Sequence, residues 1–255
     1  MPQEMSFDPS QFRIGLAICT MDHIKVPTVK SLIEVIQSGH LKNYCIVEGT
    51  LLPHARNAVT EQLLKEDITH ILYLDADQCN FTRHDIELMM YHNKDILAGI
   101  TPLRRKNKDG KRKLTFKPLD PNIDTVNGLL EVAHTGFFFT MVKREVLEAT
   151  LQPGGWFFLD RCPREDFDPE KFVKGAAVEY SKHPERLKQI FHSCVNYGRN
   201  AHIGQDPTGE DVNFCQYARQ MGFTCWIDSR IQIGHVIEDI YTPQRLIADQ
   251  EASRN

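Results

Sequence analysis

The sequence predicts an α/β protein with a mostly parallel central sheet, because short apolar segments alternate with amphipathic ones over its first hundred residues. The expected strands are residues 13–20, 44–47, 71–74 and 96–100. The expected helices are residues 27–38, 54–65 and 83–92. In sheets of this kind, ligands bind beyond the carboxyl ends of the strands. Side chains that directly follow a strand are therefore the first candidates for a functional site.

The second half of the chain has a different pattern. A polar, basic segment over 101–118 precedes a pair of strands near 129–142 and a short helix over 144–149. Residues 152–207 have no strong periodicity, which is typical of a lid, an acceptor-binding region or a disordered segment. A helix over 210–220 and a strand over 227–233 complete the expected elements. The length of 255 residues fits one large α/β domain.

Composition narrows the class of protein. The net charge of −4 argues against a general affinity for nucleic acid, and no segment has the length of a membrane span. The start lacks the features of a secretory leader, and seven scattered cysteines without a Cys-x-x-Cys pair predict free thiols in a reducing compartment. We therefore expect the cytoplasm, or the host cytoplasm if the protein is viral. A zinc site of His192, Cys194, Cys215 and Cys225 is an alternative whose spacing fits no common template.

Two carboxylates, Asp75 and Asp77, end the apolar strand over 71–74. In a strand this spacing puts both side chains on one face, where their oxygens suit Mg²⁺ or Mn²⁺ and hence a phosphorylated substrate. Aspartates at strand ends also cap the loop that follows. The apolar character of residues 71–76 favours the metal site.

A second acidic pair, Glu210 and Asp211, opens a predicted helix after Gly209. Thr208 and Asp211 fit a capping box, which is a purely structural role. Alternatively, a carboxylate held there stays ionised and accepts a proton from an attacking hydroxyl. The pattern alone leaves both roles open.

Four further residues are candidates for ligand contacts. His235 ends an apolar strand, where it is either a structural hydrogen bonder or a metal ligand. Arg56 and Asn57 begin a helix; Arg56 suits a phosphate or carboxylate and Asn57 a base or ribose, unless both lie on an exposed first turn. Gly136 precedes three phenylalanines and allows a neighbouring backbone or a ligand to approach closely.

The basic cluster, which we define as residues 104–113, holds seven cations in ten residues around an Asp-Gly turn. Such a sequence is typical of a solvated hairpin tip. In a chain that is acidic overall, it also creates a local positive field suited to an anionic polymer or a phosphate-rich ligand.

The order of these features is more specific than any one of them. An Arg-Asn helix, an Asp-x-Asp strand end, Gly-Phe-Phe-Phe, a helix opened by Gly-Glu-Asp and a late Gly-His together resemble the GT-A glycosyltransferases, within them the compact family-2-like enzymes of bacteria and large viruses. The resemblance covers residues 12–238. It implies a single Rossmann-like GT-A domain with a nucleotide-binding half (12–100), an acceptor-side half (101–238) and a C-terminal tail (239–255).

The resemblance also implies a role for each matching residue. Mn²⁺ or Mg²⁺ would be held by Asp75, Asp77 and His235 against the diphosphate of a nucleotide sugar, most simply a UDP-sugar. Asp211 would be the catalytic base of an inverting transfer. The implied nucleotide-sugar contacts are Thr20, Arg56, Asn57, Asp75, Ala76 and Gly136. The implied acceptor contacts are Arg104, Arg105, Lys111, Lys113, Trp156 and Glu210. Family members commonly place an acceptor-binding aromatic near the catalytic acid, whereas Trp156 lies in the irregular segment.

The expected function is thus a metal-dependent glycosyltransferase. Its acceptor is a hydroxylated, for example hydroxymethyl, pyrimidine in DNA, whose backbone the basic cluster would grip, or alternatively a glycan or lipid-linked molecule. A nucleotidyltransferase is a second alternative, but it would normally carry a glycine-rich phosphate loop, and none follows Gly15. A non-catalytic module that binds nucleotide sugars is a third.

Overall fold

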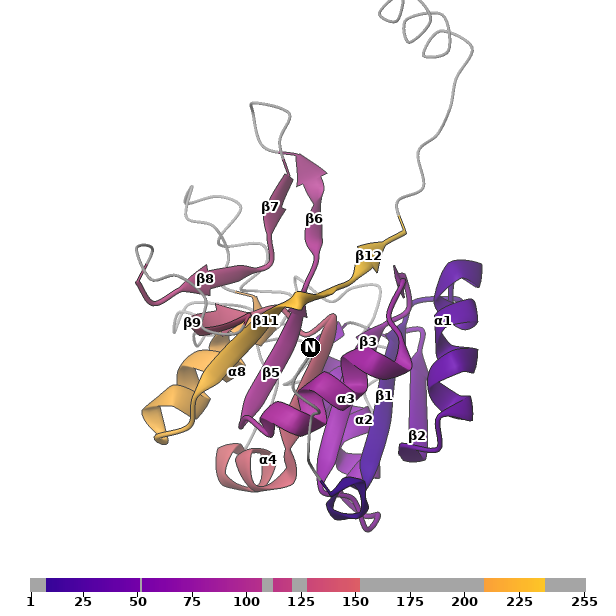
Figure 1. The fold of residues 1–255 in the computed structure, drawn as a ribbon, viewed down its shortest axis with the longest axis horizontal. Helices are drawn as coiled ribbons and strands as arrows, with labels where there is room; N and C mark the ends of the chain where they lie inside the picture. The colour runs from indigo at the N-terminus through magenta and orange to yellow at the C-terminus, as the bar shows by residue number, and fades with distance from the viewer. Residues whose placement is uncertain (1–7, 51, 107–111, 121–127, 152–208, 237–255) are drawn as a thin grey trace, which may run out of the picture.

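The computed structural model describes residues 8–50, 52–106, 112–120, 128–151 and 209–236. Its centre is an eight-stranded sheet with the strand order β2-β1-β3-β10-β5-β11-β9-β8 (Figure 1). The strands are β1 (Ile14–Thr20), β2 (Leu41–Glu48), β3 (His70–Asp75), β5 (Ile96–Ile100), β8 (Phe116–Pro118), β9 (Leu129–Thr135), β10 (Phe139–Lys143) and β11 (Cys225–Gln232). The predicted mixed α/β class with a large, mostly parallel sheet is confirmed.

The antiparallel strands lie in the second half of the chain. β1 is parallel to β2 and β3, and β5 is parallel to β11. β10 lies between β3 and β5 and is antiparallel to both. The prediction of a strand pair near 129–142 is wrong in its pairing, since β9 binds β11 and β8 instead. The three residues between β9 and β10 lead to separate positions in the sheet, which the sequence pattern of two consecutive strands does not reveal.

Helices cover both faces of the sheet. They are α1 (Val26–Gln37), α2 (Leu52–Leu63), α3 (Arg83–His92), α4 (Arg144–Thr150) and α8 (Glu210–Gln220), after a 3₁₀ turn over Pro9–Gln11. The apolar sides of α2, α4 and α8 pack on one face, and those of α1 and α3 pack on the other. Successive side chains of the buried strands point to opposite faces of the sheet, so the same strands contribute to the hydrophobic cores on both faces.

Local chemistry fixes where the helices begin and end. Thr82 and Asp85 form a capping box at the start of α3, and Asn93 ends this helix in a left-handed conformation with a φ of 42°. Gly39 follows α1 with a φ of +75°, which an L side chain rarely adopts. The predicted end of this helix at Gly39 is confirmed.

The acidic pair does not lie wholly in a strand. β3 ends at Asp75, whereas Asp77 lies in a turn that leads into the short strand β4 (Gln78–Cys79). β4 pairs antiparallel with β12 (Gly234–His235). Strand alternation therefore does not determine the relative direction of the two carboxylates, and the reasoning that placed them on one strand face is corrected.

The described ends of the basic cluster, residues 104–106 and 112–113, belong to a hairpin of β6 (Pro102–Lys106) and β7 (Arg112–Leu114), which projects beyond the carboxyl end of β5 (Figure 1). Residues 107–111, with Lys111, lie outside the described residues. The irregular segment 152–207 with Trp156, the zinc alternative's His192 and Cys194, and the tail 239–255 also lie outside them. Among the helices of the described residues, none combines the length and apolar character that crossing a membrane requires.

Candidate functional site

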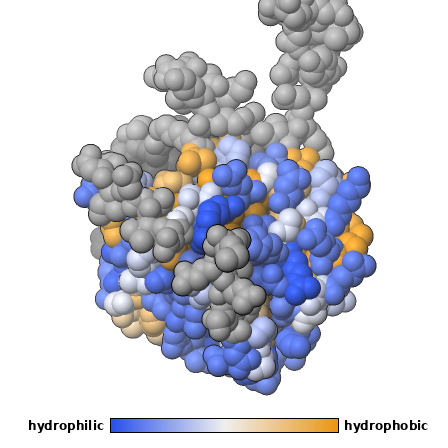
Figure 2. Space-filling view, in the orientation of Figure 1, coloured by the Kyte–Doolittle hydropathy of each residue, from blue (hydrophilic) through white to orange (hydrophobic). Residues whose placement is uncertain are grey.

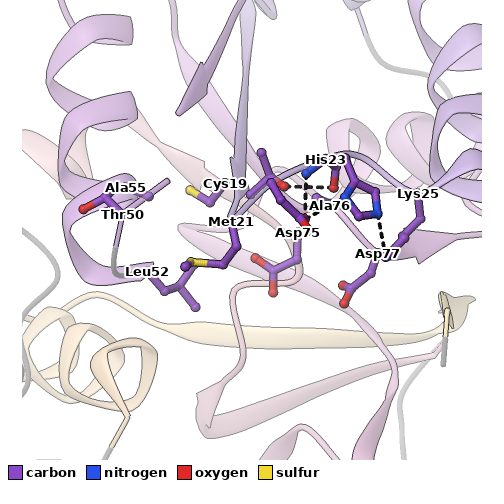
Figure 3. A pocket seen from close by; sticks show the side chains of 12 residues that line it. Cys19, Met21, His23, Lys25, Thr50, Leu52, Ala55, Asp75, Ala76 and Asp77 are labelled. Atoms are coloured by element: carbon purple, nitrogen blue, oxygen red, sulfur yellow. Dashed lines mark hydrogen bonds and ion pairs between the residues drawn. The ribbon is translucent and has the colours of Figure 1, made fainter. Parts of the chain in front are cut away.

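A pocket of about 310 Å³ lies where β1 and β3 end side by side (Figure 3). The pairing of Cys19 with Asp75 brings these two strand ends together. The lining comes from the loop after β1, the start of α2 and the turn after β3: Cys19, Thr20, Met21, Asp22, His23, Lys25, Thr50, Leu52, Ala55, Asp75, Ala76 and Asp77. Thr20, Asp75, Ala76 and Asp77, which the sequence singles out, thus share one cavity. Figure 3 shows the two carboxylates extending to the same side.

The loop after β1 adds two residues that the sequence analysis missed, His23 and Lys25. The Thr20 hydroxyl donates to the carbonyl of His23 at 2.9 Å, and the backbone N–H of Lys25 donates to the carbonyl of Ala76 at 2.9 Å. The Lys25 ammonium lies 2.7 Å from Nε2 of His23. A cation therefore lies at the rim of an otherwise acidic pocket. Ligands bind beyond the carboxyl ends of the strands in a parallel sheet. The loop after β1 lies at such an end, as Asp75 does, so the same rule predicts that it contributes to the site.

Arg56 lies behind the pocket rather than in it. Its side chain on α2 is 3% exposed and donates to Asp75 Oδ1 at 3.2 Å, to the carbonyl of Phe137 at 3.3 Å and to Glu210 Oε1. The guanidinium carbon lies 5.8 Å from the centre of the Phe137 ring. The sequence-based expectation was a nucleotide contact, but the geometry gives Arg56 a different position: it joins the end of β3 to the start of α8. Asn57 is half-buried on α2 and outside the lining of the pocket.

Three carboxylates share the field of this single buried cation. Burial raises the pKa of Asp75, and the Arg56 charge opposes that rise. The same two causes act on Glu210 and Asp211, and the pKa of each carboxyl is raised overall. Burial also disfavours the charged form of Arg56, but the surrounding carboxylates more than compensate and raise its pKa. Arg56 thus opposes the protonation that burial favours in three acidic groups.

Asp211 is held at the N-terminus of α8. The N-cap of this helix is Gly209, so Asp211 is the second helical residue and does not occupy the third position that a capping box with Thr208 requires. Its Oδ1 accepts from the backbone N–H of Val212 at 2.7 Å. A Cβ at Gly136 would lie 3.4 Å from Oδ2, and one at Gly209 would lie 2.6 Å from Oδ1. Gly209 therefore leaves the space that the carboxylate fills, whereas a Cβ at Gly136 would only touch it.

Asp77 faces His235 across the junction of β4 and β12. Oδ2 of Asp77 lies 3.4 Å from Nε2 of His235, while Nδ1 of His235 lies 3.1 Å from the carbonyl of Pro102. A carbonyl only accepts hydrogen bonds, so Nδ1 carries the proton that it donates. In a neutral imidazole Nε2 then presents a lone pair to a carboxylate oxygen, and this contact is favourable only with a cation between them or a second proton on the ring.

This pair fits a hard divalent cation. Adjacent ligands of an octahedral ion with bonds of about 2.1 Å stand about 3 Å apart, close to the observed separation of Nε2 and Oδ2. A carbonyl that orients the opposite nitrogen of a ligating histidine is a common feature of metal sites. Within the described residues no three His, Cys, Asp or Glu side chains come close enough to hold an ion by themselves. Asp77 and His235 would therefore need further ligands from a phosphate and from water.

The other expected residues lie apart from this centre or outside the described chain. Glu210 turns its carboxylate toward Arg56. The backbones of Arg104, Arg105 and Lys113 belong to the β6–β7 hairpin, whereas Lys111 and Trp156 fall outside the described residues.

The zinc alternative finds no support in the two members that the structure describes. Cys215 and Cys225 are fully buried free thiols, and Cys215 donates to the carbonyl of Thr135 at 3.7 Å. Both sulfurs belong to the core beneath α8.

Comparison with known proteins gives fold-level likenesses only. No model of a known protein family matches the chain, and no curated protein does. Similar solved structures include A197 from STIV, with a TM-score of 0.49 and 18% identity over 89% of this chain and 86% of that one. They also include GalNAc-T7 with UDP, GalNAc and Mn²⁺, with a TM-score of 0.48 and 11% identity over 89% of this chain and 44% of that one. With TM-scores below 0.5, the case for a function rests on the side chains of the site.

Replacing Arg56 by methionine is expected to destabilise the protein strongly, because it leaves Asp75 and Glu210 buried without their cation. Removing one partner of a buried ion pair costs about 3–5 kcal/mol. The loss should be larger at pH 8 than at pH 5, because protonation relieves the orphaned carboxylates at lower pH. Urea unfolding at both pH values measures it.

The control is Arg83→Met on α3, which removes an exposed pair with Glu87. That change should cost less than about 1 kcal/mol. Equal losses for the two variants would show that Arg56 does not organise the site.

Proposed function

We propose that the protein is a metal-dependent glycosyltransferase that uses a nucleotide-diphosphate sugar, with a UDP-sugar as the first candidate. The observation that carries the proposal is the pair of Asp77 and His235, fixed at the spacing of two ligands beside a pocket at the strand ends. Asp211 supplies an ionisable carboxylate linked to the same pocket through Arg56 and Asp75.

The pocket is suited to the nucleotide. Its wall combines apolar groups such as Met21 and Leu52 with polar groups such as Thr20 and Thr50. Its volume of about 310 Å³ is at the lower end of the usual range for small-molecule sites. The Lys25 ammonium is a counter-charge for a diphosphate at the rim. Lys25 is also the N-cap of α1, whose first turn among the described residues carries no acidic side chain and therefore favours an anion.

Asp77 and His235 would hold Mn²⁺ or Mg²⁺, with Asp75 assisting or binding the ribose. The cation would neutralise the negative charge that develops on the departing nucleoside diphosphate. Asp75 has one oxygen within hydrogen-bond distance of Arg56, and 27% of its side chain is exposed to the pocket. This orientation suits a contact with a ribose hydroxyl as well as it suits a metal ligand.

Asp211 would accept the proton of the acceptor hydroxyl as that oxygen attacks the anomeric carbon. A base that acts on the attacking oxygen implies a single displacement, and hence inversion at that carbon. The raised pKa of Asp211 makes it a stronger base than an exposed aspartate, while the Arg56 charge favours its ionised form.

The acceptor that we propose is a hydroxyl group on an anionic polymer. The projecting β6–β7 hairpin carries the basic cluster and suits the backbone of DNA that contains a hydroxymethyl pyrimidine. A glycan or a lipid-linked acceptor is the alternative, in which the cluster is only solvated. A nucleotidyltransferase or a non-catalytic module would leave the position of Asp211 unexplained.

UDP is expected to stabilise the protein only when Mn²⁺ is present. At a ligand concentration of 100 times Kd, binding adds about 2.7 kcal/mol, which corresponds to about 5 °C or more in Tm. Asp77→Asn should abolish the Mn²⁺-dependent part of the shift, and Asp67→Asn, an exposed control paired with Arg13, should keep it. Thermal unfolding with UDP, GDP, CDP and dTDP measures the effect, and no shift with any nucleotide would overturn the proposal.

Replacing Asp211 by asparagine is expected to lower sugar transfer by about 10²–10⁴-fold and to leave the UDP and Mn²⁺ thermal shift intact. The readout is UDP release from UDP-glucose and UDP-N-acetylglucosamine with DNA containing 5-hydroxymethylcytosine or with a glycan acceptor.

The pH dependence of this transfer is a second readout on the same residue. In the wild type, kcat should fall as pH falls through the raised pKa of Asp211, above the ordinary value of about 3.9 for an aspartate. Burial raises this pKa most, Arg56 and the backbone N–H of Val212 lower it, and Asp75 raises it further. Full transfer activity in Asp211→Asn would contradict its role as the base.

A further inference from the structure

β2 forms one end of the eight-stranded sheet, and its outer face is exposed. Side chains along this strand alternate strictly between half-buried and exposed. The exposed set is Lys42, Tyr44, Ile46 and Glu48. Tyr44 is 74% exposed and Ile46 is 46% exposed, although both are large and apolar. Within the described residues this strand has a neighbour on one side only, and an edge strand with large exposed apolar side chains can pair with another strand.

One flank of α1 extends the apolar surface of β2. Val29, Ile33 and Ile36 are all exposed and recur at the spacing of one helix side. The opposite flank faces β4 and α3, because Ser31 accepts from the N–H of Asn80 and Glu34 accepts from the N–H of Arg83.

The apolar flank of α1 is therefore turned toward β2. Tyr44 and Ile46 lie on the sheet face that α1 covers, because they pair with Leu16 and Ile18 of the core beneath that helix. Figure 1 shows α1 beside β2 at the sheet margin, and Figure 2 shows apolar side chains gathered at the same margin.

The sequence of β2 is complementary to itself. If two copies of the strand pair antiparallel with Cys45 opposite Cys45, Lys42 of each copy lies opposite Glu48 of the other. In the same register Tyr44 lies opposite Ile46. Opposite charges and aromatic–β-branched pairs directly across an antiparallel ladder are both stabilising. Shifting the register by two residues toward either end loses both charge pairs.

We propose that β2 is a dimerisation edge, at which a second copy of this chain adds its own β2 antiparallel and centred on Cys45. The contact is isologous, as a two-fold dimer requires, and it joins two sheets into one. The apolar flanks of the two α1 helices lie on the same face of the joined sheet and cover Tyr44 and Ile46 of both copies. This dimer is independent of the proposed glycosyltransferase function.

Charge substitution on β2 tests the register. Wild-type protein should sediment as a dimer, whereas Lys42→Glu and Glu48→Lys should each put like charges opposite one another and raise the dimer Kd at least tenfold. The double variant Lys42→Glu/Glu48→Lys should restore the dimer. An equimolar mixture of the two single variants should form a heterodimer, because each chain then carries the charge that the other lacks.

A cross-link at the two-fold axis supplies an independent readout. Side chains directly opposite each other have Cβ atoms about 4.5–5.5 Å apart, within reach of a disulfide after a small adjustment. Mild oxidation with copper phenanthroline should produce a covalent dimer of the wild type that Cys45→Ser prevents. Cys79→Ser, a partly buried control on β4, should still cross-link.

Three outcomes would overturn the proposal. They are a wild-type monomer at all concentrations, a dimer that persists in both single charge variants, and a dimer that cross-links without Cys45. The charge variants should retain the UDP and Mn²⁺ thermal shift if the site works as proposed, so failure of the dimer and failure of the proposed function are distinguishable. Both substituted side chains are exposed, and the unchanged unfolding of the single variants checks that they fold.

Discussion

The buried guanidinium of Arg56 is the interaction on which the arrangement of this site depends. It lies among carboxylates from two distant parts of the chain, Asp75 at the end of β3 and Glu210 at the start of α8. A cation buried to 3% exposure is tolerated only where charges and hydrogen bonds compensate it fully. The buried carboxylates in turn need the positive charge of Arg56. The ion pairs therefore hold the end of β3 and the start of α8 together. Asp211, beside Glu210, is positioned by this balance.

A second constraint brings β12 to the turn after β3. β5 and β11 pair with a register shift between Ile227 and Gln232, and Gly99 makes room for the close approach, because a Cβ there would lie 2.7 Å from Ile231. Thr101 then donates to the carbonyl of Ile233 at 2.9 Å. These contacts direct the chain after β11 across to β4, where His235 meets Asp77. The metal ligands that we propose thus depend on a glycine and a threonine that neither bind nor react.

The sequence predicts the elements of the first hundred residues well, because each has its own periodicity and its own start or stop signal. Thr20, Asp75, Ala76 and Asp77, which the sequence also singles out, line one pocket at the strand ends. The roles proposed for these residues, and for Asp211 and His235, stay predictions.

Sequence patterns do not predict the features that depend on contacts between distant parts of the chain. Nothing local indicates that Arg56, which was expected near the start of a helix, becomes an internal bridge from the second turn of α2, because its partner Glu210 lies 154 residues away. The pairing of β9 and β10 with other strands likewise depends on the order of the whole sheet. His23 and Lys25 are different, since their position directly after β1 was a sufficient signal.

We propose that one cation, held by Asp77 and His235, binds the diphosphate of a nucleotide. Pulsed electron paramagnetic resonance of Mn²⁺ bound to the protein with UDP detects the nuclei attached to the ion and therefore reports on both ligands. We expect a ¹⁴N coupling from the imidazole and a ³¹P coupling from UDP on the same ion, with the ¹⁴N coupling lost in His235→Gln. A ³¹P coupling without ¹⁴N in the wild type would contradict it.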